Sequence, residues 1–322
     1  MRKIFKILIL LTLISSCQEE KSNRSDIKPV YFDYENSWDE WNLFGKVKSI
    51  TEFRANFKAN DELDEKKLQS KKWFTDFGAI KRTEYFGTFG DITQIEEYKY
   101  DSNNNQLESN TELVGAKRKI KTVTKNDTIN KTTTHKSYLN DSLAEINIIF
   151  YGDDDRVKRH LEIKNNDTIK STLNSKYDGN DNLVSEVQTE INGEESETTG
   201  NYFQYDENDR IISSTFEMYH TKYISKYKWS DNKIISREDY SILPDESKHF
   251  NESYEYDENF NPIIHKKYIE SQIDQVTKYE YELDDRGNWT KRTVFLKQSR
   301  LGSKDFEKVY VELREISRAA PA

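Results

Sequence analysis

The side chains that could hold a metal or act as catalysts in this 322-residue chain are five histidines, one cysteine and 58 acidic residues. The histidines lack the HxH and HExxH spacings that direct two imidazoles at one zinc ion. The sequence also has no Gly-x-Ser-x-Gly elbow and no Gly-rich phosphate loop. It therefore predicts no metal site, no cofactor and no enzymatic activity. The histidines are His135, His160, His220, His249 and His265.

Two acidic clusters, Asp153-Asp154-Asp155 and Asp284-Asp285, have the oxygen ligands that calcium prefers. Neither has EF-hand spacing, and both fall at a recurring turn, where Asp is favoured for its hydrogen bonds to the backbone. Glycoside hydrolysis needs a pair of carboxylates, but no such pair can be singled out among so many acidic residues. An enzyme acting on polysaccharide therefore stays as an alternative function.

The only cysteine, Cys17, follows a stretch with the composition of a signal peptide. Basic residues precede an apolar core at residues 7–14, which is shorter than the ~20 residues of a membrane-spanning helix. The stretch Ile14-Ser15-Ser16-Cys17 resembles a bacterial lipobox. This resemblance implies that residues 1–16 are a lipoprotein signal peptide and that Cys17 carries the lipid.

Residues 17–36 are polar and show little apolar patterning, which predicts a flexible tether. We expect a single β-repeat domain to follow at residues 37–318. The acidic start of the tether, Gln18-Glu19-Glu20-Lys21, is similar to the signal that sends lipoproteins to the cell surface in Bacteroidota. The resemblance implies an outer-membrane lipoprotein, on either the periplasmic or the cell-surface side, that is attached to the membrane through its N-terminal lipid.

The composition excludes one class of partner and favours one class of fold. The formal charge is −9, and removal of Arg2, Lys3 and Lys6 with the signal leaves −12. Such a chain is not expected to bind nucleic acid, because that binding needs basic surface to displace counterions. Hydrophobic residues make up only 34%, yet 20 Tyr and 16 Phe are present. A thin β architecture reconciles these facts, since each strand then buries one face.

An aromatic residue followed by an Asp- and Asn-rich turn recurs along the chain. Successive copies are 26, 51, 26, 28, 24, 27 and 27 residues apart, so the longest gap predicts an eroded copy near Asn126. The mean period of about 26 residues is typical of repeat proteins. The copies begin at Phe74, Tyr100, Tyr151, Tyr177, Tyr205, Trp229, Tyr256 and Leu283.

Each repeat is interpreted as two strands and two turns. Stretches such as Tyr254-Glu255-Tyr256 alternate aromatic and polar residues with a period of two, as half-buried strands do. A second set of turns falls half a period later, for example at Asn165-Asn166-Asp167 and Ile191-Asn192-Gly193. The sequence therefore predicts an all-β fold, an antiparallel meander of ~26-residue hairpins.

The Tyr-Asp turns at Tyr100, Tyr177 and Tyr256 and the stretches "DDRGNWTKR" (284–292) and "GKVKSITE" (45–52) carry a family resemblance. The chain resembles YD-repeat (Rhs-type) proteins, and more closely the lipid-anchored YD-repeat proteins of Bacteroidota, over roughly residues 43–316. Large Rhs proteins wind such hairpins into a hollow β shell around a toxin or other cargo. No extra domain is available here to enclose, so that role is not expected.

About nine two-strand repeats give ~18 strands, and a closed barrel of that size has a lumen too wide for side chains to fill. We therefore expect a curled sheet or two facing layers with aromatic residues interleaved between them. A membrane-spanning barrel is not expected, because the face opposite the aromatic residues is charged. The charged residues include Lys99, Lys228, Glu255 and Glu280.

Trp73, Trp229 and Trp289 lie at or beside repeat turns, where ligand-contacting residues collect. They are candidate ligand-binding residues. The alternative is that they pack inside the sheet as the other aromatic residues do, and Trp229 occupies the inward position of its repeat.

Three short motifs, each an Asp followed by Ser or Thr and an aliphatic residue, resemble the O-glycosylation acceptor of Bacteroidota. They make Thr128, Ser142 and Thr168 candidate sites. Together these observations predict a lipid-anchored cell-envelope protein that acts as a binding or structural module. The expected partner is a glycan or another envelope or surface component. A scaffold within a larger envelope complex is a further alternative.

Overall fold

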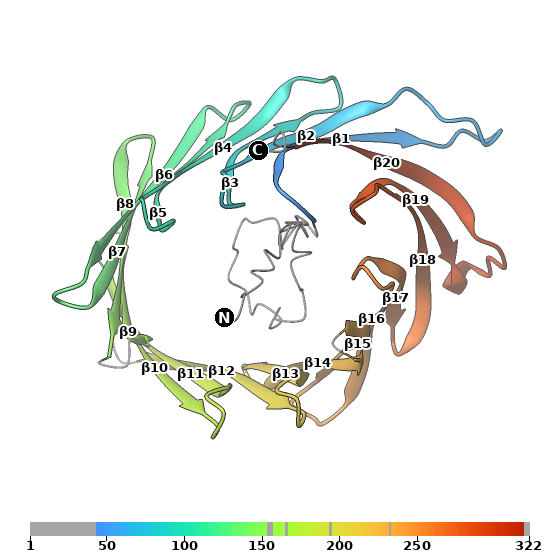
Figure 1. Ribbon diagram of the computed structural model, residues 1–322. Helices are drawn as coiled ribbons and strands as arrows, with labels where there is room; N and C mark the ends of the chain where they lie inside the picture. Colours follow the sequence, from blue (N-terminus) through green and yellow to red (C-terminus); the bar gives the residue numbers. More distant parts are fainter. Residues whose placement is uncertain (1–42, 153–156, 165–166, 193–194, 232, 319–322) are drawn as a thin grey trace, which may run out of the picture.

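The computed structural model describes residues 43–152, 157–164, 167–192, 195–231 and 233–318 (Figure 1). The predicted signal peptide, Cys17 and the predicted tether lie outside these ranges. Within them the chain is all β apart from one short 3₁₀ turn, η2 (Ser299–Leu301). This described part of the chain contains no helix of the length and apolar character needed to cross a membrane.

The described residues form twenty strands that follow one another along the chain. They are β1 (Val47–Asn56), β2 (Lys67–Phe74), β3 (Ile80–Phe86), β4 (Ile92–Tyr100), β5 (Gln106–Leu113), β6 (Arg118–Asp127), β7 (Thr132–Leu139), β8 (Ser142–Tyr151), β9 (Val157–Lys164), β10 (Asp167–Tyr177), β11 (Leu183–Asn192), β12 (Glu195–Tyr205), β13 (Ile211–Met218), β14 (Thr221–Ser230), β15 (Lys233–Ile242), β16 (Lys248–Tyr256), β17 (Pro262–Ile269), β18 (Gln272–Leu283), β19 (Trp289–Gln298) and β20 (Glu307–Arg318).

Every strand pairs antiparallel with the next, and β20 pairs antiparallel with β1, so the sheet closes into a barrel (Figure 1). This seam runs from the Val47–Arg318 pair to the Asn56–Tyr310 pair. The prediction of an all-β antiparallel meander is confirmed. The prediction of a curled or two-layered sheet is wrong. Closure pairs the backbone N–H and C=O groups that an open sheet would leave exposed along two edges.

The repeat turns join each even-numbered strand to the next odd-numbered strand, so they lie together at one end of the barrel, the repeat rim. Asp257 shows their geometry. Its Oδ1 accepts the N–H groups of Asn259 at 2.8 Å and Asn261 at 2.9 Å, and Phe260 has a φ of 61°. These bonds explain why the repeat begins its turn with Asp. The same pattern recurs at Asp101, Asp178, Asp206 and Asp284.

The aromatic residue before a repeat turn has a recurring hydrogen bond of its own. The Tyr100 hydroxyl donates to the carbonyl oxygen of Ile80 at 2.7 Å, and the Tyr205 hydroxyl donates to that of Leu183 at 2.9 Å. In each case the acceptor is the first residue of the preceding strand. The side chain therefore ties the end of one strand to the start of its neighbour, which gives the repeated Tyr an architectural role.

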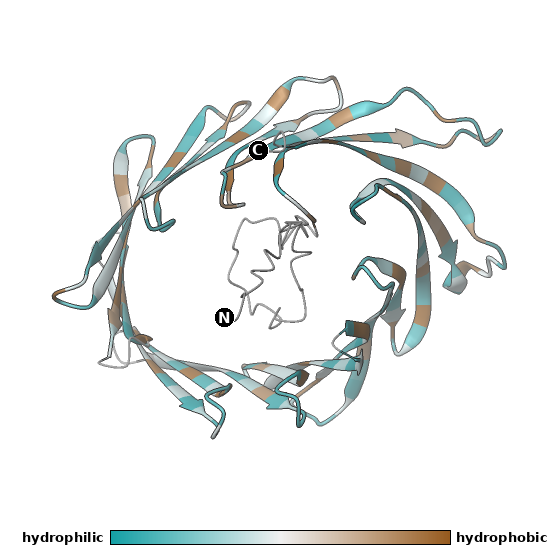
Figure 2. Ribbon diagram, viewed as in Figure 1, coloured by the Kyte–Doolittle hydropathy of each residue, from teal (hydrophilic) through white to brown (hydrophobic). Residues whose placement is uncertain are grey.

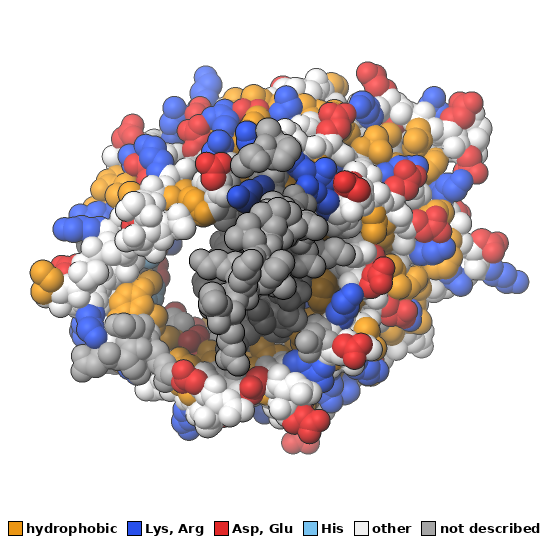
Figure 3. All heavy atoms as spheres, viewed as in Figure 1, with side chains coloured by type: hydrophobic (Ala, Val, Ile, Leu, Met, Phe, Trp, Pro, Cys, Tyr) orange, Lys and Arg blue, Asp and Glu red, His pale blue; other side chains and the backbone are white. Residues whose placement is uncertain are grey.

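Alternate residues of each strand point to opposite faces of the sheet. One face carries exposed ion pairs between neighbouring strands, such as Lys99 with Glu108 and Lys228 with Glu238. Charges of both signs are interspersed over the outside of the barrel in Figure 3, and polar and apolar segments alternate along the strands in Figure 2. The opposite, inner face combines aromatic residues with hydroxyl and charged groups. Because such a wall is compatible with solvent, the lumen does not have to be filled by side chains, and the expectation of two packed layers failed for this reason.

One cluster of buried apolar side chains lies beside the seam at the repeat rim. Leu43, Val47, Ile50, Phe74 and Ile80 form one cluster, in which each side chain is at most 3% exposed. They come from β1, β2, the start of β3 and the residues just before β1. The apolar core therefore stabilises the place where the first strands of the chain meet the last.

Asn288, which is fully buried, fastens the start of the described chain to the last repeat turn. Its Oδ1 accepts the Phe44 N–H at 2.5 Å, and its Nδ2 donates to the Phe44 carbonyl at 3.1 Å and to Asp284. Asp284 also forms an ion pair with Arg318 at the end of β20. The final repeat turn therefore holds both ends of the barrel together.

Candidate binding site on the inner wall

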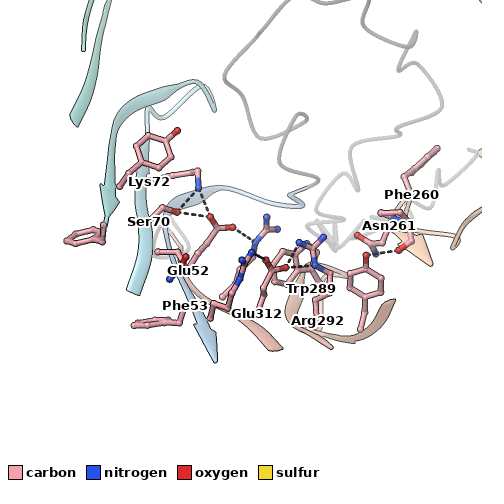
Figure 4. A pocket seen from close by; sticks show the side chains of 16 residues that line it. Glu52, Phe53, Ser70, Lys72, Phe260, Asn261, Trp289, Arg292 and Glu312 are labelled. Carbon is pink, nitrogen blue, oxygen red and sulfur yellow. Dashed lines mark hydrogen bonds and ion pairs between the residues drawn. The ribbon is translucent and has the colours of Figure 1, made fainter. Parts of the chain in front are cut away.

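A pocket of about 640 Å³ lies on the inner wall beside the seam (Figure 4). Its lining comes from β18 to β20, from β1 to β3 across the seam, and from residues 260–262. Its charged side chains share one face of these strands, opposite the face that carries the exposed pair Lys66 and Glu315. Its charged residues are Glu52, Arg54, Lys72, Arg292, Glu312 and Arg314. Its aromatic lining residues include Tyr85, Phe86, Phe260, Tyr281 and Trp289. Phe53 borders it as well, but its ring lies against Lys66, which pairs with Glu315.

Glu52 on β1 is the centre of one ion-pair cluster. Its Oε1 accepts Arg314 Nε of β20 at 3.0 Å, and its Oε2 accepts Lys72 Nζ of β2 at 2.5 Å. Ser70 Oγ donates to the same Oε2 at 2.7 Å. The side chains of Lys72 and Arg314 are only 2% and 6% exposed, so this carboxylate balances two buried cations from the strands on either side of it.

The charges of this cluster shift one another's pKa values. Burial alone would raise the pKa of Glu52, but Arg314 and Lys72 outweigh it and hold the pKa at about 2. Burial lowers the pKa of Lys72 and of Arg314, although Glu52 acts in the opposite direction on both. Glu52 is therefore ionised throughout the neutral range.

Glu312 on β20 is the centre of a second cluster. Its Oε1 accepts Arg54 Nη2 of β1 at 2.6 Å, and its Oε2 accepts Arg292 Nε of β19 at 2.6 Å. Burial would lower the pKa of Arg292, but the opposing effect of Glu312 is larger, so the pKa is raised. Arg54 Nε is buried and has no hydrogen-bond partner among the described residues. Two arginines thus share one carboxylate on this part of the wall.

Trp289, a predicted ligand-binding residue, lies in the wall of this pocket. The Arg314 guanidinium carbon lies 3.6 Å from the centre of its ring, and that of Arg292 lies 5.0 Å from it. The residue is 6% exposed. Because Arg314 covers a face of the ring, Trp289 acts as a platform for the arginines rather than as an open stacking surface.

The other two predicted tryptophans lie elsewhere. Trp73 pairs in register with Arg82 of β3, which forms ion pairs with Glu84 and Glu97, so Trp73 shares the outer face with these charges. Trp229 on β14 donates its Nε1–H to the carbonyl of Ile211 at 2.8 Å. That is the bond that the repeat tyrosines make, so Trp229 has their architectural role. The structure does not bring the three tryptophans together.

Replacing Trp229 by Phe is expected to destabilise the barrel by about 1 kcal/mol beyond the effect of the smaller ring, because the Ile211 carbonyl loses its donor. Replacement by Tyr supplies a hydroxyl at the position where Tyr100 and Tyr205 carry one. Thermal unfolding of the two variants measures the difference. Equal melting temperatures for the Phe and Tyr variants would contradict the role assigned to this bond.

The predicted O-glycosylation residues are all exposed. Thr128 lies in the turn between β6 and β7 at the repeat rim, whereas Ser142 and Thr168 lie at the starts of β8 and β10 at the opposite rim. Their modification stays a prediction. Among the described residues no three His, Cys, Asp or Glu side chains are placed to hold a common metal ion. Asp284 makes the hydrogen bonds of its hairpin turn, and Asp153 to Asp155 lie outside the described residues.

Sequence reasoning did not find the two ion-pair clusters. Glu52 and Arg54 stand two residues apart, as do Glu312 and Arg314, so each pair shares one face of its strand. That spacing was the available signal. It does not show which residues meet, because Glu52 and Arg314 are separated by 262 residues and come together only through the seam.

No family model matches the sequence, and no curated protein matches it either. Among solved structures, a porin-like protein from Bacteroides uniformis aligns with 84% of this chain and 98% of its own, at 9% identity and a TM-score of 0.34. A TcdB2-TccC3-Cdc42 structure aligns with 72% of this chain, at 11% identity and a TM-score of 0.30. This chain spans 14% of that longer chain, and neither likeness assigns it to a family.

Proposed function

We propose that the protein is a lipid-anchored binding module of the cell envelope whose barrel binds a glycan on its inner wall. The observation that carries this proposal is the pocket beside the seam, in which aromatic and charged side chains line one concave surface. Aromatic faces stack on sugar rings, and charged groups bond sugar hydroxyls. Phe260 and Tyr281 lie on one side of the pocket, and Tyr85 and Phe86 on the other.

An array of envelope polysaccharides tests this function with purified protein. Phe260→Ala removes an aromatic side chain from the pocket, and Phe89→Ala removes a matched one that is 97% exposed outside it. We expect retention of the bound glycan to fall at least about tenfold for Phe260→Ala and to stay unchanged for Phe89→Ala. Absence of binding to any glycan, or equal binding by the two variants, would refute the proposal.

Attachment through Cys17 is part of the same proposal and is supported by the lipobox-like stretch Ile14-Ser15-Ser16-Cys17. Cys17→Ala is expected to move the protein from the membrane fraction to the soluble fraction, because acyl chains supply the membrane affinity. Cell fractionation with labelled fatty acid measures this outcome. Membrane retention of the unlabelled variant would show that another part of the chain is the anchor.

We further propose that the chain is related to YD-repeat proteins, which the recurring Asp turns and hairpin period support, and that it catalyses no reaction. The pocket is lined by charges paired in ionic contacts, and the described residues that line it include no histidine or cysteine. Turnover of polysaccharides or peptides by the purified protein would favour the alternative of a polysaccharide-cleaving enzyme. Glycan binding without turnover would agree with the proposal.

A further inference from the structure

The two arginines that share Glu312 give the pocket a local excess of positive charge. Arg54 and Arg292 each form an ion pair with this carboxylate, which is 14% exposed. At the neighbouring cluster, Lys72 and Arg314 both contact Glu52. Among the described residues, the Glu312 cluster therefore has two cations and one carboxylate.

Arg54 is the cation of the pocket that a ligand reaches most easily. Its side chain is 42% exposed, whereas those of Lys72 and Arg314 are 2% and 6% exposed. It donates through Nη2 to Glu312, and its buried Nε has no partner among the described residues. The guanidinium thus has donors that Glu312 does not use, beside Arg292, whose side chain is 25% exposed.

We propose that this pocket binds an oxyanion carried by a polysaccharide, a carboxylate or a sulfate group, through Arg54 and Arg292. The inference rests on the proposed glycan-binding function and specifies its ligand class. The planar guanidinium donates paired N–H groups that match the geometry of carboxylate and sulfate oxygens. A ligand anion here would neutralise the excess charge in a partly buried site, where uncompensated charge is costly. The aromatic residues of the pocket would contact the rest of the sugar.

Titration calorimetry of the mature protein with three oligosaccharides of equal length tests the proposal. Oligogalacturonate supplies carboxylates, chondroitin sulfate supplies sulfates as well, and dextran is neutral. We expect at least one acidic oligosaccharide to bind at least about tenfold more tightly than dextran, and Arg54→Gln to weaken that binding about tenfold. Lys99→Gln removes the same charge from the outer face, where that side chain is 67% exposed, and is expected to change affinity less than about twofold.

The outcomes separate the ligand class from the glycan-binding function. Binding of dextran as tightly as the acidic sugars would overturn the oxyanion assignment and leave glycan binding intact. Equal losses for Arg54→Gln and Lys99→Gln would overturn the assignment to this pocket. Absence of binding of all three oligosaccharides, both to the unaltered protein and to the variant described next, would overturn both proposals. Circular dichroism confirms that each variant is folded.

The chain also contains an acidic, aromatic stretch, "YFDYENSWDEW" at residues 31–41, that a cationic pocket could attract. A variant with Asp33→Asn, Glu35→Gln, Asp39→Asn and Glu40→Gln removes the negative charge of this stretch, and its affinity for the acidic sugar is compared with that of the unaltered protein. Unchanged affinity for the acidic sugar supports the proposal. Binding that is measurable only in this variant would assign the pocket to the protein's own acidic stretch and overturn the proposal.

Discussion

Replacing Glu52 by Gln is expected to lower the free energy of unfolding by about 3–5 kcal/mol, because it leaves two buried cations without their carboxylate. Lys72 and Arg314 are nearly inaccessible to water and approach Glu52 from opposite sides. Gln has the same shape, but its NH₂ group would face one of these cations. Denaturant-induced unfolding of both proteins measures the loss. The free energy of unfolding should fall with denaturant concentration with the same slope for both.

The pH dependence of this effect has a definite sign. The folded pKa of Glu52 is about 2, below its ordinary value of 4.5, so its stabilisation is complete above about pH 4.5 and is lost as the pH falls toward 2. The shift corresponds to about 3 kcal/mol, in line with the loss expected for Glu52→Gln. The stability difference between the unaltered protein and the variant is therefore expected to narrow between pH 4.5 and 2.

Glu315→Gln is the matched control on the outer face. Glu315 lies on β20 and pairs with Lys66, but their side chains are 64% and 53% exposed. An exposed pair contributes little, so we expect a change below about 1 kcal/mol. Equal effects of Glu52→Gln and Glu315→Gln would show that the inner cluster does not stabilise the seam.

The repeat unit could be predicted from the sequence because its determinants are local. Asp257 bonds the backbone two and four residues ahead, and the alternation around Tyr254 lies within one strand. The strands β9 to β12 also end and begin on either side of residues 165–166 and 193–194, close to the expected boundaries. Each of these features depends on neighbours within a few residues, which a sequence pattern records.

The closure of the barrel and the pocket could not be predicted in this way. Whether a meander curls, stacks or closes depends on the pairing of its first and last strands, such as Ile50 with Ile316. The sequence does not show this pairing, because no local pattern links residues so far apart. Trp229 illustrates the same limit. Its place at a repeat turn made it a candidate ligand-binding residue, whereas its Nε1 makes the hydrogen bond of the repeat.

The seam between β1 and β20 closes the barrel, and the pocket exists only where these strands meet. Thr51 and Glu315 lie directly opposite each other across it. In a Cys17→Ala chain, Thr51→Cys with Glu315→Cys is expected to form an intramolecular disulfide, since paired residues of adjacent strands are within disulfide reach. Closing so long a loop is expected to stabilise the protein by up to about 5 kcal/mol.

A control pair, Thr51→Cys with Thr172→Cys, places the two thiols on β1 and β10, which lie on opposite walls of the barrel (Figure 1). The decisive measurement is intact mass under oxidising conditions, with unreacted thiols alkylated. We expect monomers with a complete disulfide for residues 51 and 315 and two alkylated thiols for the control. Free thiols at 51 and 315, or linkage only between molecules, would contradict a closed barrel.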